Sequence, residues 1–198
     1  MLIVFEGADA TGKQTQAEML ARKLANEGIN TTLIDFPDYN SVYGRMIKEY
    51  LKTGKKPVEE TLLLYLIDQY AKKETIENKS KNGVVICDRY WYSNLAHQVV
   101  RPGGEKLKQW IINCASQMPK PDLVFLTYLN AKTSEMLMRE KEKDSHELNI
   151  EYQIKVREKY LEVAQEMGWT ILHCVKNGAL RPPEDIHEEV IKKVREKM

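Results

Sequence analysis

Short, continuous runs of apolar residues recur along the chain, and each run is about as long as one β-strand. The runs are rich in Val, Ile and Leu, which is typical of strands buried on both faces of a parallel sheet. They cover Leu2–Phe5, Thr32–Phe36, Val84–Cys87, Leu123–Leu129 and Thr170–Val175. We therefore expect these runs to form the core strands.

Segments with helical periodicity lie between the apolar runs. In Lys13–Glu27, Ala17, Leu20 and Leu24 share one helix face, and Gly28 follows as a stop signal. The other predicted helices are Tyr43–Leu51, Val58–Asn78, Gly104–Met118, Ser134–Met138, Asn149–Met167 and Pro183–Lys197. Because strands and helices alternate, the pattern predicts an α/β doubly wound sheet that binds ligands at the carboxyl ends of its strands.

The chain has 198 residues without an internal repeat or linker, so we expect residues 1–198 to form a single domain. The 30 Lys and Arg residues nearly balance 29 Asp and Glu residues, which leaves a formal net charge of +1. This balance argues against a general nucleic-acid-binding protein, whose surface would be strongly basic. It permits a local basic pocket for a small phosphate.

The compartment is indicated by three cysteines, Cys87, Cys114 and Cys174, which have no CxxC spacing. Such a set is typical of buried thiols in a cytosolic protein. The apolar runs are shorter than the ~18 residues that a membrane span needs, and the first residues lack the basic start of a signal peptide. We expect a cytoplasmic protein without a membrane partner.

The first apolar run leads into a glycine-rich loop, and a predicted helix follows. Gly7 and Gly12 permit backbone angles that turn successive N–H groups into one concavity, at which the helix dipole also points. Lys13 has the position that reaches the β- and γ-phosphates of a nucleotide. The segment therefore predicts an ATP-binding phosphate loop, with a structural glycine turn as the alternative. The predicted loop comprises Gly7, Ala8, Asp9, Ala10, Thr11, Gly12, Lys13, Gln14 and Thr15.

Gln14 departs from the usual pattern of this loop, which has Ser or Thr after the lysine to hold Mg²⁺. Three arrangements stay open. The amide oxygen of Gln14 ligates Mg²⁺, or it holds a water that does so, or Thr15 shifts inward.

A second motif, Asp88-Arg89, ends the buried run Val84–Cys87. An Asp at the carboxyl end of a strand beside a phosphate loop is a usual second anchor for Mg²⁺. The guanidinium of Arg89 offers a planar fork for a phosphate. A surface ion pair between the two side chains is the alternative, but the neighbouring loop favours a nucleotide site.

With these motifs on hand, the chain resembles the thymidylate kinase family along nearly its whole length. The most specific match is the combination of FEGxDxxGK with DRYxxSNxAHQ. The matching segments are FEGADATGKQTQ, the Phe36-Pro37 pair, LLLYLIDQY, DRYWYSNLAHQ and PKPDLVFL. The resemblance implies an α/β P-loop NTPase fold of the nucleoside-monophosphate-kinase type, with a five-stranded parallel sheet flanked by helices and a short flexible lid. It also implies phosphorylation of dTMP by ATP with Mg²⁺, and a homodimer.

The resemblance further implies roles for single residues. Asp9 would contact the sugar 3′-hydroxyl near the transferred phosphoryl group, and Arg89 would clamp the phosphate of dTMP. Tyr65 would stack on the base, and His97 stands near the sugar where the family usually has Tyr. The implied catalytic residues are Lys13, Asp9, Arg89 and Arg139; the implied metal-binding residues are Asp88 and Gln14. The implied substrate-binding residues are Asp9, Phe36, Pro37, Tyr65, Gln69, Arg89, Ser93, Asn94 and His97.

Three features depart from the family pattern. Asp35 precedes the Phe-Pro pair where the family often has Arg, and a carboxylate cannot bind phosphate. Gln69 stands where the family usually has Arg, and a neutral amide would reach the base carbonyl with less affinity. The expected lid motif has Ser145 in place of its arginine. Charge stabilisation would therefore fall to Lys13, Arg89 and lid cations.

The segment Arg139–Asp144 is polar throughout and alternates in charge. Taken alone it is typical of a solvated helix face or loop, but its place matches the family lid, at about residues 139–147. A segment with so little apolar surface cannot offset its own ordering entropy. We therefore expect it to order over bound nucleotides, with Arg139, Lys141 or Lys143 on the phosphates.

Two functional alternatives stay open beside a dTMP kinase. Because Gln69 and His97 alter the base and sugar contacts, the chain could instead serve another pyrimidine nucleotide or a deoxynucleoside. Gln14 and the missing arginines also admit a catalytically silent nucleotide-binding protein, which would bind ATP without turnover.

Overall fold

The computed structural model describes residues 1–53, 56–130, 133 and 150–198. The predicted helix Ser134–Met138, the expected lid at about 139–147 and the predicted catalytic Arg139 lie outside these residues.

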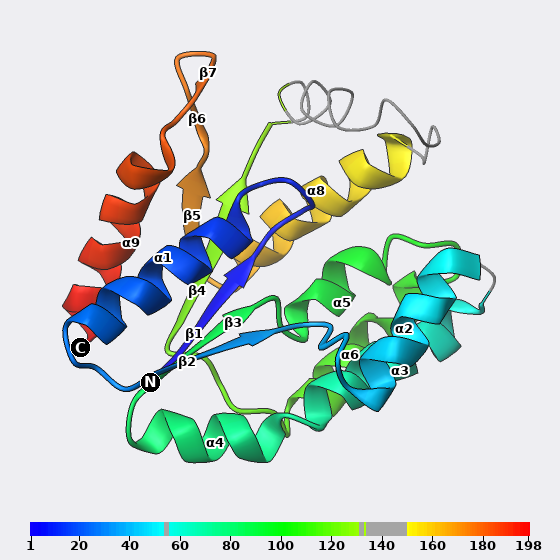
Figure 1. The fold of residues 1–198 in the computed structure, drawn as a ribbon. Helices are drawn as coiled ribbons and strands as arrows, with labels where there is room; N and C mark the ends of the chain where they lie inside the picture. Colours follow the sequence, from blue (N-terminus) through cyan, green and yellow to red (C-terminus); the bar gives the residue numbers. More distant parts are fainter. Residues whose placement is uncertain (54–55, 131–132, 134–149) are drawn as a thin grey trace.

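A five-stranded parallel sheet forms the centre of the molecule, as expected (Figure 1). Its order is β2-β3-β1-β4-β5, so the first strand lies in the middle. Each strand begins and ends within two residues of its predicted bounds. The strands are β1 (Leu2–Glu6), β2 (Thr31–Asp35), β3 (Val84–Asp88), β4 (Leu123–Tyr128) and β5 (Thr170–His173).

Helices cover both faces of the sheet, because alternate residues of each strand point to opposite sides. Ile3 and Phe5 of β1 pack with α1 (Lys13–Asn26) and α9 (Pro183–Lys197), which lie together on one face in Figure 1. Val4 belongs to the core of the other face. The helices gathered there are α2 (Val42–Thr53), α3 (Val58–Tyr70), α4 (Lys73–Lys81), α5 (Tyr92–His97), α6 (Lys108–Ala115) and α8 (Ile150–Glu166).

Two predicted helices are divided in the structure. The segment 58–78 becomes α3 and α4, with a turn at Ala71 and Lys72. Leu66 and Ile76 both point into the same core on either side of this turn, so the apolar pattern continues across it without a local break signal. The segment 104–118 likewise becomes a short 3₁₀ helix, Glu105–Leu107, followed by α6.

Two further elements were not predicted. Helix α5 begins three residues after Arg89, inside a segment whose aromatic residues hide the helical period. A hairpin of β6 (Val175–Lys176) and β7 (Ala179–Leu180) extends beyond β5. In the part of the chain that the structure describes, every helix is too short or too polar to cross a membrane.

Candidate functional site

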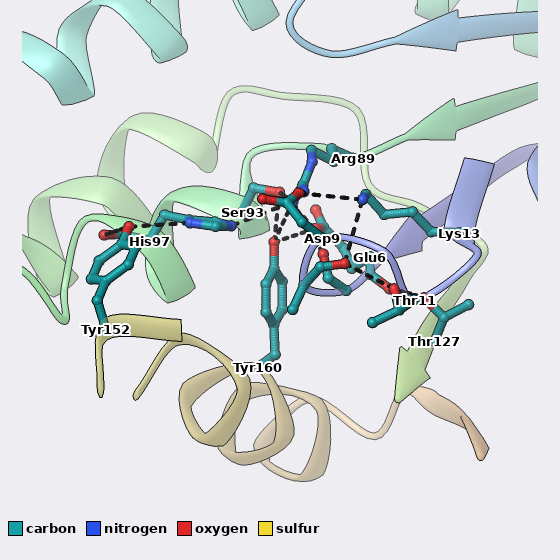
Figure 2. Close-up of polar contacts among 12 residues, drawn as sticks. Glu6, Asp9, Thr11, Lys13, Arg89, Ser93, His97, Thr127, Tyr152 and Tyr160 are labelled. Atoms are coloured by element: carbon teal, nitrogen blue, oxygen red, sulfur yellow. Dashed lines mark hydrogen bonds and ion pairs between the residues drawn. The ribbon is translucent and has the colours of Figure 1, made fainter. Parts of the chain in front are cut away.

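The two sequence motifs meet at the carboxyl edge of the sheet. Strands β1 and β3 are neighbours, and Phe5 pairs with Asp88. The glycine loop that follows β1 therefore lies beside Asp88, the last residue of β3. Figure 2 shows Arg89, the next residue, next to this loop. The fold thus brings together residues about 80 positions apart in the chain.

The glycine loop turns directly into α1. Gly12 caps this helix with a left-handed φ of 84°, which glycine adopts without steric cost. The hydroxyl of Thr11 donates to the Ala8 carbonyl oxygen at 2.9 Å and lies 2.7 Å from the hydroxyl of Thr127 on β4. The loop is thereby tied to a second strand, and the free N–H groups at the start of α1 lie where an anion binds favourably.

Gly7 packs so closely that a side chain would not fit. A Cβ atom there would lie 2.6 Å from Thr127 Oγ1 and 2.7 Å from the Thr127 carbonyl oxygen, and φ is 152°. We expect Gly7→Ala to lower the free energy of unfolding by about 2 kcal/mol, because overpacking adds to backbone strain. The phosphoryl transfer that the sequence resemblance implies should also fall, since the loop must shift. Urea unfolding and steady-state assays measure the two effects.

Gly28→Ala is the matched control for this prediction. Gly28 also has a left-handed φ, 79°, but an added Cβ would meet no described atom within 4 Å. It should cost only the conformational strain, about 1 kcal/mol, and leave activity unchanged. Equal losses of stability and activity in the two variants would contradict the close packing of Gly7.

Lys13 lies at the start of α1 with its side chain buried. Its ammonium is 3.5 Å from the carbonyl oxygen of Ala8 and 3.8 Å from Asp9 Oδ1. Burial lowers the pKa of Lys13, and the nearby Arg89 guanidinium lowers it further. Two cationic groups held close together form a strong attractor for phosphate.

Arg89 is the centre of the polar network shown in Figure 2. Its Nη2 donates to Asp9 Oδ1 at 2.5 Å, and its Nη1 donates to the carbonyl oxygen of Gly7 at 3.1 Å. Burial opposes the charge of Asp9, but the Arg89 guanidinium outweighs this effect and holds the pKa of Asp9 below its usual range. A phosphate bound near Arg89 would therefore lie beside the fixed guanidinium of Arg89 and the ionised carboxylate of Asp9.

A cavity of about 630 Å³ opens next to Arg89. All the residues that the sequence predicts to bind substrate line it: Asp9, Phe36, Pro37, Tyr65, Gln69, Arg89, Ser93, Asn94 and His97. The cavity has further lining residues that the sequence did not predict, among them Tyr39, Tyr50, Arg101 and Tyr152. These lie in helices and loops whose local pattern carries no signal for a shared pocket.

Two buried amides face each other in this cavity. Asn94 Nδ2 donates to Gln69 Oε1 at 3.1 Å, and Gln69 Nε2 donates to the Tyr90 carbonyl oxygen at 3.4 Å. Both side chains are almost fully buried. A buried amide can both donate and accept hydrogen bonds, which suits recognition of the edge of a base.

His97 is held between Arg89 and α8. Its Nε2 lies 3.4 Å from Arg89 Nη1, and its Nδ1 lies 3.2 Å from the hydroxyl of Tyr152. Burial and the Arg89 charge lower the pKa of His97 to about 3, so the ring is neutral at neutral pH. Because arginine has no acceptor, the contact with Arg89 favours the tautomer in which Nδ1 carries the ring proton and Nε2 does not.

Asp88 fits a metal ion that also binds phosphate oxygens. Its Oδ1 is buried and has no hydrogen-bond partner among the described residues. Gln14 is exposed, and its Nε2 donates to Glu18 Oε1 at 3.1 Å. The described residues hold no cluster of three or more His, Cys, Asp or Glu side chains placed to bind a metal. Mg²⁺ commonly takes one or two carboxylates and completes its shell with phosphate and water.

A glycine loop between the central strand and its helix, with an Asp on the adjacent strand of a parallel sheet, defines a P-loop nucleotide-binding protein. The model of the thymidylate kinase family matches residues 5–190. The chain therefore belongs to the thymidylate kinase family and is a phosphotransferase.

Similar proteins cover nearly the whole chain. A probable thymidylate kinase of Methanocaldococcus jannaschii is 36% identical over 96% of this chain and 94% of its own. The thymidylate kinase of Plasmodium falciparum is 33% identical over 97% of this chain and 88% of its own. A thymidylate kinase crystal structure from Ehrlichia chaffeensis has a TM-score of 0.75 with 22% identity and covers 98% of both chains, which shows the shared fold.

Proposed function

We propose that the protein transfers the γ-phosphoryl group of ATP to the phosphate of dTMP, giving ADP and dTDP. The observation that carries this proposal is the contact of Arg89 with both the glycine loop and the nucleoside-sized cavity. The loop would hold the donor phosphates at one side of Arg89, and the cavity would hold the acceptor at the other. The names of the similar proteins support dTMP as the acceptor.

The glycine loop, residues 7–15, would bind the ATP phosphates through its backbone N–H groups. Lys13 then neutralises the charge that develops on the transferred group, as a preorganised donor does. In-line transfer needs little covalent chemistry from the protein, so positioning and charge account for most of the catalysis.

Asp88 is the residue we assign to Mg²⁺, because its buried Oδ1 has no hydrogen-bond partner within the described part of the chain. The exposed Gln14 would act through a water or with its amide turned away from Glu18. Mg²⁺ held there would supply positive charge that neutralises the donor phosphates.

The acceptor nucleotide would lie with its phosphate at Arg89 and its base between Phe36 and Tyr65. Asp9 would contact the sugar hydroxyl, and the Gln69–Asn94 pair would bind the edge of the base. The neutral His97, braced by Tyr152, would lie beside the sugar. Pro37 and Ser93 complete this proposed binding site.

The test is phosphorylation of dTMP, dUMP, dCMP and thymidine by ATP with Mg²⁺. The proposal expects dTMP to have the highest kcat/KM. A preference for dCMP or for thymidine would contradict it and would point to the neutral Gln69 amide as the cause. Binding of ATP with no turnover of any acceptor would indicate a silent nucleotide-binding protein.

We also propose that the protein forms a homodimer through helices α2 and α3, which pack side by side. Met46 of α2 and Leu63 and Ile67 of α3 are each about half exposed, and apolar exposure on adjacent helices favours an interface. Light scattering should give twice the chain mass of 23.0 kDa. A Leu63→Lys, Ile67→Lys variant should give the mass of one chain, and a monomeric parent protein would contradict the proposal.

A further inference from the structure

Glu6, the last residue of β1, is a fully buried carboxylate that Figure 2 shows beneath Arg89. Its Oε1 accepts from the backbone N–H of Tyr90 at 2.8 Å. Its Oε2 accepts from the hydroxyl of Ser93 at 2.7 Å and from the hydroxyl of Tyr160 at 3.1 Å. Each of these partners lies beside Arg89 or contacts it.

Tyr160 extends from α8 to the same point, and its side chain is almost fully buried (Figure 2). Arg89 Nη1 donates to the Tyr160 hydroxyl oxygen at 3.0 Å. Because arginine only donates, the proton of Tyr160 points to the other side, where Glu6 and Ser93 lie. The hydrogen bonds therefore run in one direction, from the guanidinium through the hydroxyl to the carboxylate.

Strand β1 also stabilises the backbone conformation of Arg89. Its φ is 67°, in the left-handed region that side chains other than glycine rarely adopt. The N–H of Arg89 donates to the Phe5 carbonyl oxygen at 2.8 Å, and the next N–H, that of Tyr90, donates to Glu6. Strand β1 thus holds both the backbone and, through Tyr160, the side chain of Arg89.

We propose that Tyr160, anchored by Glu6, is a positioning residue that holds the Arg89 guanidinium ready for the acceptor phosphate. This inference rests on the proposed function, because it assigns Arg89 to the acceptor. Asp9 accepts from Nη2 of the guanidinium, and Tyr160, at 3.0 Å, is the nearest acceptor of Nη1 among the described residues. Without Tyr160 the guanidinium of Arg89 can swing toward Asp9. The phosphate of dTMP then binds more weakly, because the guanidinium is out of position.

The charged and titratable groups around Glu6 come from four elements besides β1. Arg89 and Cys87 belong to β3 and the turn after it, Lys13 to α1, Tyr92 to α5 and Tyr160 to α8. Burial raises the pKa of Glu6 to about 7, although the Ser93 hydroxyl and Arg89 oppose the rise. Assays at about pH 8 therefore keep Glu6 mainly as the carboxylate that accepts these hydrogen bonds.

The first test is Tyr160→Phe, which removes one hydroxyl without changing charge. The KM for dTMP should rise about tenfold, the factor for loss of one hydrogen bond to a charged group, while the KM for ATP stays within about twofold. Isothermal titration should show the same loss for dTMP. Thermal unfolding verifies that the variant is folded.

Tyr90→Phe is the matched control, because it also removes a buried tyrosine hydroxyl. That hydroxyl donates to the Pro119 carbonyl oxygen at 3.0 Å, away from Arg89. The KM for dTMP should stay near the parent value in this variant. An equal rise in both variants, or an unchanged KM in Tyr160→Phe, would overturn the inference.

A double-mutant cycle tests whether Tyr160 acts through Arg89. In an Arg89→Ala background, Tyr160→Phe should have no further effect on dTMP affinity, because the group it positions is gone. A further tenfold loss would show that Tyr160 acts independently and would overturn the inference. A parent enzyme that binds dTMP without phosphorylating it would refute the proposed function alone, since the binding measurements still decide the role of Tyr160.

Discussion

Lys13→Met is expected to lower phosphoryl transfer by roughly 10²–10³-fold while the protein stays folded. The ammonium of Lys13 lies at the start of α1 beside the glycine loop, where the donor phosphates would bind. Methionine keeps a long, flexible side chain but removes the charge that stabilises the transferred group. The measurement is kcat for dTMP at saturating ATP.

The stability of the Lys13→Met variant should equal or exceed that of the parent. Burial already disfavours the charged form of Lys13, so an apolar side chain at that position removes a desolvation cost. Lys23→Met is the control, since Lys23 lies on the same helix, is half exposed and pairs with Glu27 at 3.3 Å. Near-parental turnover in folded Lys13→Met protein would refute the phosphate-binding loop.

Arg89→Ala is expected to raise the KM for dTMP by about 10- to 100-fold and to change the KM for ATP much less. Charge-assisted bonds from a guanidinium to a phosphate account for a loss of this size. The guanidinium faces the cavity and contacts the loop through the carbonyl oxygen of Gly7 and the carboxylate of Asp9. Steady-state kinetics with each substrate varied in turn separate the two constants.

Arg22→Ala provides the comparison for this variant. Arg22 is an exposed residue of α1 that pairs with Glu18 at 3.4 Å, so its loss should leave both constants unchanged. If Arg89→Ala instead raised the KM for ATP and spared that for dTMP, Arg89 would serve the donor rather than the acceptor.

Much of this architecture could be predicted from local sequence. The apolar runs predict the strands because a parallel sheet buries both faces of each strand, which leaves uninterrupted Val, Ile and Leu. The Gly7 and Gly12 positions predict the loop because only a few backbone angles direct N–H groups to one point. The family motifs predicted the cavity residues around Arg89, but not the lining residues Tyr39, Tyr50, Arg101 and Tyr152.

Other features depend on contacts that no local pattern encodes. Glu6 and Tyr160 are separated by 154 positions, and Tyr160 lies in an amphipathic helix where an aromatic residue is typical of the core. The turn that divides α3 from α4 at Ala71 contains no Gly or Pro, so the sequence does not predict it. The roles of Arg139 and of the expected lid, at about 139–147, stay predictions because they lie outside the described residues.

Helix α8 meets the cavity at two places, since Tyr152 bonds with His97 and Tyr160 bonds with Arg89. Eight residues of α-helix measure about 12 Å, so α8 fixes the placement of Tyr152, at the sugar end of the proposed acceptor site, relative to Tyr160, at the phosphate end. Substitutions on the outer face of α8 leave this placement unchanged. Inserting one residue between the two tyrosines would turn one relative to the other by about 100°, so that they could no longer contact His97 and Arg89 at the same time. The length of this segment is therefore under tighter constraint than its composition.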